Sequence, residues 1–209
     1  MVLMHHIPSL VPKIFHQMVW HFSREQNNIY LTFDDGPVPG VTDFVLEELG
    51  LRNMKATFFM VGDNVRKFPD LARKVVEEGH GLGNHTFSHM NGFQNSAERY
   101  LNDIACCQRE IIRATGENPL IFRPPYGKIT KKQFQLTAKK YKLIMWDVIS
   151  GDYDQHQSPQ KCLKKSIKYS QNGSIVLFHD QQKTEAVIRA VLPEYLDYIK
   201  RSGFQTCIL

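Results

Sequence analysis

Two adjacent carboxylates, Asp34 and Asp35, directly follow the apolar run 29–33 and precede a Gly-Pro turn. Because the two carboxylates are adjacent at the end of an apolar strand, their side chains must point in different directions, so one can bind a cation while the other faces a substrate. A turn or a helix cap is the competing interpretation, because Asp is common at both places after a strand.

A pair of histidines, His85 and His89, has the spacing that places two imidazoles on the same side of a helical turn. Both rings could then reach one metal ion, and Thr86 and Ser88 could orient the ring nitrogens through hydrogen bonds. Two histidines and one aspartate would leave coordination positions open for water and substrate, as a catalytic zinc requires. A structural zinc would instead use four protein ligands, usually including cysteine.

Two further apolar runs end in polar residues. Arg123 precedes a Pro-Pro-Tyr-Gly turn, and its guanidinium could pair with a carboxylate of the site. A backbone N–H held by the two prolines could also stabilise an oxyanion. His179 and Asp180 follow the apolar run 174–178. The alternative for Arg123 is a surface turn with a salt bridge. The alternative for His179 is a structural histidine.

Short runs rich in β-branched and aromatic residues alternate along the chain with segments of helical periodicity. This alternation predicts a mostly parallel sheet with helices packed outside it. It fits either a closed or distorted α/β barrel or an open doubly wound sheet, and the pattern alone does not separate the two. The expected strands are residues 29–33, 56–61, 81–84, 120–122, 143–148, 174–178 and 204–209. The clearest expected helices are residues 41–51, 65–78, 96–115, 130–140, 159–170 and 185–202.

The polar residues follow the expected strands at their carboxyl ends. Asp34 follows the first strand, His85 the third, Arg123 the fourth and His179 the sixth, and a polar loop of residues 151–159 follows the fifth. In α/β barrels and in open α/β sheets, ligands bind at the edge formed by the carboxyl ends of the parallel strands. We therefore expect residues that are scattered in the sequence to lie together in one site.

The composition fits one globular domain and gives no sign of a nucleic-acid partner. The 209 residues are 42% hydrophobic and 22% charged, which suffices for a buried core. The net charge is +5, and lysines are spread along the expected helices in a pattern typical of solvated helix faces. No helix-turn-helix, zinc-finger or aromatic-basic motif accompanies these lysines, so we expect no nucleic-acid binding.

Cysteine spacing and the N-terminal composition predict a soluble, cytoplasmic protein. The four cysteines form no CxxC pair, so we expect them to be reduced and mostly buried. The N-terminus lacks the pattern of a signal peptide, and no window is long and apolar enough for a transmembrane helix. Residues 10–22 carry apolar residues at helical spacing, which predicts a short amphipathic helix. That helix would pack against the domain or, as the alternative, make a peripheral membrane contact.

Taken in order, four motifs resemble those of the polysaccharide deacetylases, the family-4 carbohydrate esterases. TFDDGP at 32–37, HTFSH at 85–89, RPPYG at 123–127 and LFHD at 177–180 are similar to the first, second, third and fifth motifs of that family. The resemblance implies a catalytic domain of residues 29–209 behind an N-terminal amphipathic extension of residues 1–28. The implied fold is α/β, a single-domain distorted (β/α) barrel of about seven parallel strands.

The same resemblance implies a metal-dependent hydrolase that removes N-acetyl groups from an amino sugar. Asp35, His85 and His89 would hold the divalent metal. Zinc is the first expectation for that metal, with cobalt, nickel or manganese as alternatives.

The resemblance also implies roles for residues around the metal. Asp34 would be the general base toward the water that the metal activates, and Arg123 would pair with Asp34 and keep it ionised. His179 would protonate the leaving amine, and the Tyr126 backbone N–H would help to stabilise the oxyanion. The residues expected to bind the substrate are Pro125, Tyr126, Trp146 and Tyr153, the last standing where the family usually has Trp.

The fourth motif of the family is altered in this chain. Ile149 occupies the position where the family commonly has an aspartate that contacts the arginine and tunes the acid histidine. His179 would therefore lack its usual charged neighbour, unless Asp147, Asp152 or Asp154 takes over that role.

Two other functions compete with an active deacetylase. One is a catalytically silent carbohydrate-binding protein with the same fold, and the other is a hydrolase of another non-peptide C–N bond. Retention of Asp34 favours the enzyme, because a mere sugar or metal binder has little use for a second carboxylate beside the ligands. The substrate could be a polysaccharide, an oligosaccharide or a lipid-linked glycan, and the sequence leaves this choice and the oligomeric state open.

Overall fold

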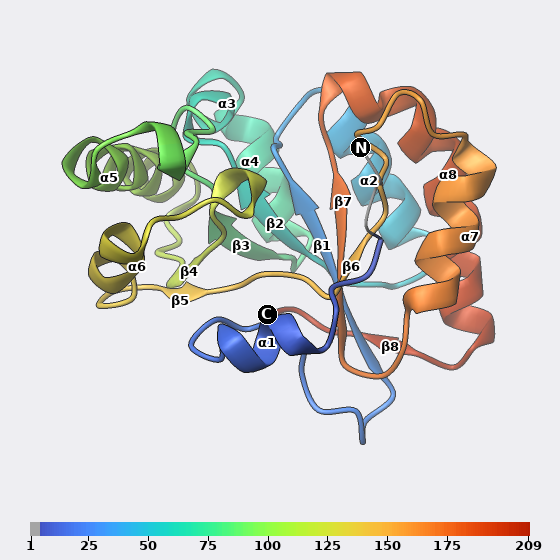
Figure 1. Cartoon of the computed structure of the whole chain (residues 1–209). Coiled ribbons are helices and arrows are strands. Elements are labelled where there is room, and N and C mark those ends of the chain that lie inside the picture. The colour runs from blue at the N-terminus through green and yellow to red at the C-terminus, as the bar shows by residue number, and fades with distance from the viewer. Residues whose placement is uncertain (1–4) are drawn as a thin grey trace.

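The structure is a computed structural model and describes residues 5–209. Its parallel strands form one curved sheet with helices outside it (Figure 1). The strands are β1 (Asn28–Asp34), β2 (Thr57–Met60), β3 (Gly81–Asn84), β4 (Ile121–Phe122), β5 (Lys142–Leu143), β6 (Val148–Ile149), β7 (Ser174–His179) and β8 (Gln205–Thr206). The sheet order is β5-β4-β3-β2-β1-β7-β6, and β8 pairs with the start of β1. This parallel path confirms the distorted barrel of about seven strands.

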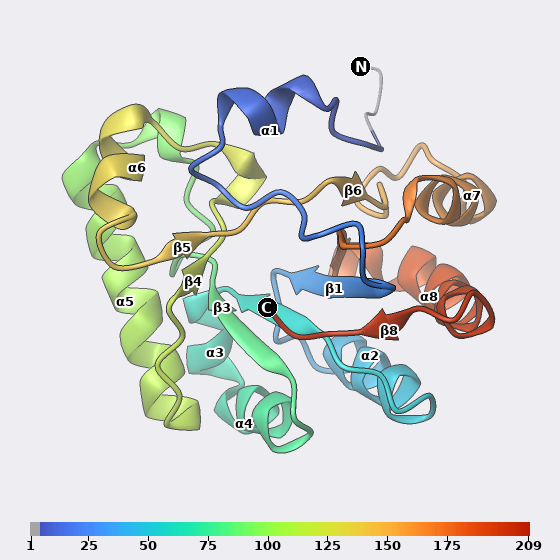
Figure 2. The same cartoon turned by 90° about the horizontal axis from the view of Figure 1, so that it is seen from below.

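The helices surround the sheet on its outer side (Figure 2). They are α2 (Val41–Gly50), α3 (Gly62–Lys67), α4 (Pro69–Glu77), α5 (Ala97–Thr115), α6 (Lys131–Thr137), α7 (Pro159–Tyr169) and α8 (Glu185–Arg201), preceded by the short α1 (Leu10–Ile14). Three short 3-10 turns are η1 (Gly92–Gln94), η2 (Pro125–Gly127) and η3 (Gln182–Thr184). The main core lies between the sheet and these helices, where the rings of Phe33 and Phe178 stack and Leu196 belongs to the same buried cluster.

Local sequence signals explain where several helices begin and end. Ser96 caps α5 by accepting a hydrogen bond from the Arg99 backbone N–H, and Gly116 ends the same helix in the left-handed conformation. The single helix expected over residues 65–78 is wrong, because the chain breaks between α3 and α4 at Phe68. Phe68 precedes a proline, and a residue in that position is disfavoured in helical conformation.

The strand expected over residues 143–148 is also wrong as a single element. Its beginning is β5, which pairs with β4, and its end is β6, which pairs with β7 at the opposite end of the sheet. Residues 144–147 therefore cross the open side of the barrel instead of continuing one strand. The local sequence pattern cannot show this crossing, because residues typical of strands occur throughout the segment 143–148.

The amphipathic helix expected over residues 10–22 is limited to α1, so that prediction is wrong in its length. Phe15 leaves the helical conformation, and the chain then runs to a β-bridge between Val19 and Ile144. The Val19 N–H donates to the carbonyl of Leu143, and the Met145 N–H donates to the carbonyl of Val19. This pairing satisfies backbone groups that the open side of the sheet would otherwise expose.

The apolar side chains of α1 and the residue after it face outward. Leu10, Ile14 and Phe15 are 62%, 59% and 51% exposed. The peripheral membrane contact expected from residues 10–22 stays a prediction. Within residues 5–209, no helix combines the length and the apolar character needed to cross a membrane. The four cysteines are free, and Cys107 and Cys162 are buried.

Candidate active site

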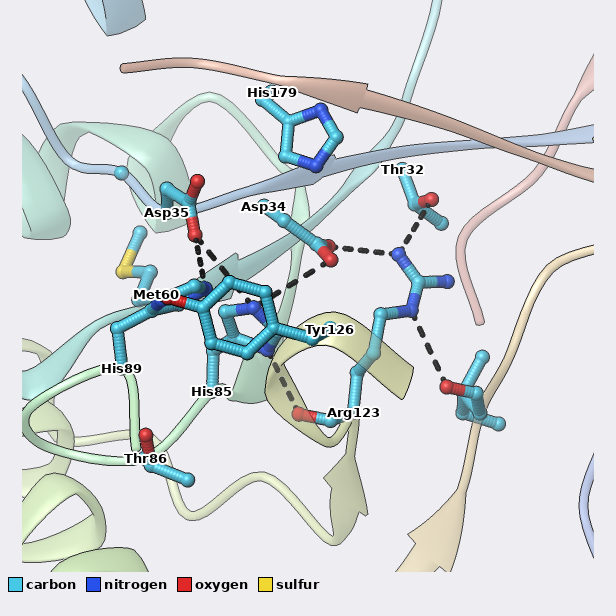
Figure 3. Close-up of polar contacts among 12 residues, drawn as sticks. Thr32, Asp34, Asp35, Met60, His85, Thr86, His89, Arg123, Tyr126 and His179 are labelled. Atoms are coloured by element: carbon cyan, nitrogen blue, oxygen red, sulfur yellow. Dashed lines mark hydrogen bonds and ion pairs between the residues drawn. The ribbon is translucent and has the colours of Figure 1, made fainter. Parts of the chain in front are cut away.

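The predicted site residues converge at the carboxyl ends of the strands, as expected from their positions in the sequence. Asp34 ends β1 and is the register partner of His179 at the end of β7. His85 follows β3, and Arg123 follows β4, whose Phe122 pairs with Asn84 of β3. Their side chains approach one another in one region (Figure 3).

Three predicted metal ligands form a compact cluster. One ligand atom each from Asp35, His85 and His89 lies within 4.8 Å of the others. Oδ1 of Asp35 is 3.0 Å from Nε2 of His89 and 3.6 Å from Nε2 of His85. This set of one carboxylate oxygen and two imidazole nitrogens is a common donor set of divalent zinc.

The outer ring nitrogens of both histidines have hydrogen-bond partners that orient the rings. Nδ1 of His85 lies 2.7 Å from the backbone carbonyl of Arg123, which can only accept, so Nδ1 carries the proton. Nδ1 of His89 lies 3.1 Å from the Tyr126 hydroxyl. Burial lowers the pKa of His85 to about 4. At neutral pH its Nε2 therefore presents a lone pair to the centre of the cluster, as a metal ligand must.

The environment of Asp35 favours its ionised form, which is the form that binds a cation. Burial opposes its ionisation, but the nearby imidazoles of His89, His179 and His85 outweigh burial and keep its pKa well below its usual range. Its Oδ1 is buried and has no hydrogen-bond partner among residues 5–209, although Nε2 of His89 is close. A buried charged oxygen without a donor is costly unless a cation occupies the space in front of it. The donor set therefore fits a divalent metal.

Asp34 does not share the role of its neighbour. Oδ1 of Asp34 accepts a hydrogen bond of 2.7 Å from Nη1 of Arg123, and both side chains are almost fully buried. Its other oxygen, Oδ2, lies 3.6 Å from Nε2 of His85 and lines the pocket described below. The two adjacent carboxylates thus have different main partners, although one oxygen of each lies 3.6 Å from Nε2 of His85. Asp35 lies beyond the end of β1 in a left-handed conformation, with φ of 86°, so the alternation of an extended strand does not account for this arrangement.

Arg123 has a partner for each part of its guanidinium. Nη1 also donates to the Thr32 hydroxyl at 2.8 Å, Nε donates to the carbonyl of Ile144, and Nη2 donates to the carbonyl of Met145. The guanidinium carbon lies 4.1 Å from the centre of the Phe59 ring. A buried ion pair is tolerated when its remaining hydrogen-bonding groups are satisfied, and this one meets that condition.

His179 has a carboxylate partner despite the altered fourth motif. Nδ1 of His179 lies 2.8 Å from Oδ1 of Asp152, and the His179 backbone N–H donates to Oδ2 of the same carboxylate. Of the three aspartates named as substitutes for the residue missing at Ile149, Asp152 is the one in contact. Burial lowers the pKa of His179, but the charge and hydrogen bond of Asp152, together with Asp35 and Asp34, raise it to about 9.

Replacing Asp152 with Asn should shift the basic limb of the pH–rate profile toward lower pH. If His179 acts as a general acid, activity falls as pH rises through its pKa. Asp152 raises that pKa, so the loss of its charge lowers the pH at which activity is lost. The measurement is kcat/KM between pH 5.5 and 10. An unchanged basic limb in Asp152→Asn would contradict the assignment of His179 as the acid.

The cluster opens into one pocket of about 290 Å³. Three residues predicted to bind the substrate, namely Tyr126, Trp146 and Tyr153, line it with Asp34, Asp35, His85, His89 and His179. Pro125 is buried in the η2 turn instead, and its contact with the substrate stays a prediction. Four further residues that the sequence did not predict as part of the lining are Ile149, Leu177, Gln181 and Lys183. Leu177 is the first residue of the LFHD motif and Gln181 directly follows it, so their nearness to His179 in the sequence is a signal that was present.

Asp180 of the LFHD motif supports the turn after Asp35. Its carboxyl accepts hydrogen bonds from the Gly36 backbone N–H at 3.0 Å and from the Thr42 hydroxyl at 2.6 Å. A Cβ atom on Gly36 would overlap this carboxyl. The position after the two carboxylates therefore requires glycine.

Gly36→Ala should lower the free energy of unfolding by about 1–3 kcal/mol, because the added methyl group overpacks a buried contact. Gly50→Ala is the matched control, since a Cβ on Gly50 meets open space. Urea unfolding of both variants measures the effect. Equal unfolding midpoints for Gly36→Ala and the unmodified protein would show that the turn can absorb a methyl group.

Comparisons with known proteins agree with this geometry. The family model described as polysaccharide deacetylase matches residues 23–144, more than half of the chain. A peptidoglycan-N-acetylglucosamine deacetylase of Bacillus cereus is 34% identical over 195 residues, covering 90% of this chain and 89% of the relative. The Bc1960 peptidoglycan N-acetylglucosamine deacetylase, solved with a bound N-hydroxybenzamide, has a TM-score of 0.89 at 28% identity and covers 97% of this chain and 95% of its own.

A longer relative is PgdA of Listeria monocytogenes, also named peptidoglycan-N-acetylglucosamine deacetylase. It is 34% identical over 183 residues, which are 88% of this chain. The match covers 38% of the Listeria protein, so this chain corresponds to well under half of that relative.

Proposed function

This chain belongs to the polysaccharide deacetylase family, and from that premise we propose that it is a carbohydrate N-deacetylase. The proposed reaction is hydrolysis of the N-acetyl group of N-acetylglucosamine in peptidoglycan with the help of a divalent metal. The proposed ligands are Asp35, His85 and His89, the proposed base is Asp34, and the proposed acid is His179. Zinc is the metal that the two histidines and one carboxylate favour, with cobalt, nickel or manganese as alternatives.

One observation carries the proposal. Asp34 lies beside the three-ligand cluster but is bound to Arg123, and it lines the same pocket as His179. A base and an acid that share one pocket with a metal cluster are the groups that hydrolysis of an unactivated amide requires. A simple metal or sugar binder has no need of this second carboxylate and its buried arginine.

Asp35, His85 and His89 would hold the divalent metal, which would supply Lewis-acid polarisation of the acetamide carbonyl and acidify a water molecule near neutral pH. Oδ2 of Asp34 takes a proton from that water as its oxygen attacks the carbonyl carbon. Arg123 keeps Asp34 in place through this step, since its guanidinium is fixed by Thr32 and by two backbone carbonyls. The C–O bond forms at this stage, and the carbonyl oxygen becomes an oxyanion.

The chain also supplies groups for the second half of the reaction. The Tyr126 backbone N–H is proposed to donate to the oxyanion, since Tyr126 sits in a left-handed turn at the rim of the pocket. Nε2 of His179 gives its proton to the sugar nitrogen as the C–N bond breaks, which releases acetate and a free amine. Asp152 holds Nδ1 of His179, so Nε2 is the ring nitrogen left to face the substrate.

The pocket walls fit a small apolar group beside the sugar. Ile149, Leu177 and the ring of Tyr153 lie on the His179 side of the lining, and Trp146 adds an aromatic surface. Such walls suit the methyl group of an acetamide and the face of a sugar ring. Tyr126 is 61% exposed and offers a further aromatic face at the entrance.

A substrate panel tests the proposed substrate class. Acetate release is measured from peptidoglycan fragments, chitooligosaccharides and a lipid-linked N-acetyl sugar, with zinc or cobalt added. We expect the highest kcat/KM on fragments that contain N-acetylglucosamine from peptidoglycan. A preference of tenfold or more for chitooligosaccharides or the lipid-linked sugar would overturn this choice of substrate and leave the reaction type in place.

A further inference from the structure

The N-terminal residues of the described chain form part of the site's support. The Ile149 N–H donates to the carbonyl of His5, and the Ile7 N–H donates to the carbonyl of Asp147. His6 forms an antiparallel bridge with Val148. Residues 5–7 thus pair with the outer edge of β6, the strand that leads into the loop of residues 150–158.

The side chain of His5 extends this pairing into the loop. His5 is only 5% exposed, and its Nδ1 lies 3.1 Å from the carbonyl of Ile149. Its Nε2 lies 2.8 Å from the Gln157 side-chain oxygen. These partners are 144 and 152 positions away in the sequence. Both partners can only accept, and a neutral imidazole has one N–H to donate, so the shorter contact with Gln157 is the hydrogen bond of the ring. His5 therefore binds the end of the loop through its ring and the residue before the loop through its own carbonyl, which accepts from the Ile149 N–H.

Gln157 connects His5 to the backbone of the loop through hydrogen bonds. Its Nε2 donates to the carbonyls of Ser150 and Gly151, both at 3.2 Å, which fixes its amide so that the oxygen faces His5. Ser150 and Gly151 immediately precede Asp152, whose N–H donates to the Ser150 hydroxyl. Residues 150–158 contain no helix or strand, so the hydrogen bonds of the Gln157 and Ser150 side chains replace regular backbone pairing in fixing the loop conformation.

Asp152 is the residue of this loop that meets the proposed acid. Its carboxylate accepts from both the backbone N–H and Nδ1 of His179, and the neighbouring Tyr153 packs edge-on against the same imidazole. From the other side His179 faces the carboxylates of Asp34 and Asp35. Asp152 is the carboxylate that is hydrogen-bonded to the His179 ring, so the position of the loop sets the orientation of that ring.

We propose that His5 is a positioning residue for catalysis: it holds Gln157 and the 150–158 loop so that Asp152 remains in contact with His179. This inference rests on the proposed function of His179 as the acid. It assigns a role to a residue outside the four motifs and outside the segment matched by the family model. His5 acts through Gln157 and Asp152 and does not line the pocket.

The test compares His5→Ala and Gln157→Ala with His16→Ala, which removes an exposed histidine from the same N-terminal segment. We expect His5→Ala and Gln157→Ala each to lower kcat about tenfold, because small displacements of catalytic groups are costly. KM should change less than twofold, and the bound metal should stay the same. The basic limb of the pH–rate profile should move to lower pH, in the same direction as in Asp152→Asn. His16→Ala should match the unmodified protein.

The double variant His5→Ala/Gln157→Ala adds a second test. Substitutions of residues that act through one network have non-additive effects on kcat. The double variant should therefore be about as impaired as either single variant. The proposal would be overturned if the loss in kcat of the double variant equalled the product of the two single losses. It would also be overturned if the pH–rate profile of His5→Ala were unchanged. Failure of the proposed function itself is separate, because it would show as equal activity of the unmodified protein and Asp34→Asn.

Discussion

Asp34→Asn should lower kcat by about 10²- to 10⁴-fold while the protein keeps its bound metal, since this is the usual contribution of a general base. The substitution removes the proton acceptor but preserves the shape and one acceptor oxygen toward Arg123. KM should change little, because Asp34 acts on the water and not on the sugar. Acetate release and metal content, measured on the same preparation, separate the two effects.

Asp147→Asn is a matched control for that experiment. Asp147 is also a buried carboxylate paired with an arginine, Arg24, at 2.7 Å, but it lies outside the pocket. Both variants weaken a charged pair, so both should lose stability. Only Asp34→Asn should lose activity per folded molecule. Equal loss of activity in the two variants would mean that Asp34 acts through stability and not as the base.

Asp35→Ala should lower the affinity for zinc by more than about 100-fold, because loss of a ligand costs at least as much as loss of a residue that orients one. Two imidazoles alone would remain, and they hold a divalent metal poorly without the carboxylate. Activity should fall with the metal and should return in part only at high zinc concentration. Metal titration of the purified variant, followed by acetate release, measures both quantities.

Asp70→Ala provides the comparison, since the Asp70 side chain is 90% exposed and lies on α4. This surface substitution should leave zinc affinity and activity unchanged. If Asp35→Ala bound zinc as tightly as Asp70→Ala, the ligand set proposed here would be wrong.

The sequence predicted the convergence of the site because that property follows from the topology of a parallel sheet. Asp34 and His179 end their strands, His85 and Arg123 directly follow theirs, and parallel strands bring their carboxyl ends to one edge. The division of roles between Asp34 and Asp35 was also expected, but for a reason that the structure does not bear out. Asp35 lies beyond the end of β1 with φ of 86°, and one oxygen of each carboxylate lies 3.6 Å from Nε2 of His85.

Other features could not be predicted because they depend on partners far away in the sequence. The crossing at residues 144–147 and the pairing of Val19 with Ile144 replace elements that local periodicity had suggested. The choice of Asp152 over Asp147 depends on which carboxylate the curved sheet places against His179. Asp147 is instead occupied by Arg24, a residue with no motif around it.

The hydrogen bond between His89 and Tyr126 illustrates the same limit within the motifs. Each residue belongs to a motif that the sequence analysis identified, and Tyr126 was expected to act through its backbone N–H. The structure adds a contact of its side chain with Nδ1 of His89. Such a contact needs the relative placement of two loops, which spacing along the chain does not encode.

The measurement that tests the central claim most directly is acetate release from peptidoglycan fragments containing N-acetylglucosamine, by protein stripped of metal and then reconstituted with zinc. Asp34→Asn, reconstituted in the same way, is run beside it. We predict release by the zinc-loaded unmodified protein, and little or none by the stripped protein or by zinc-loaded Asp34→Asn. Equal release with and without metal, or full release by Asp34→Asn, would contradict the account of a metal-dependent deacetylase with Asp34 as its base.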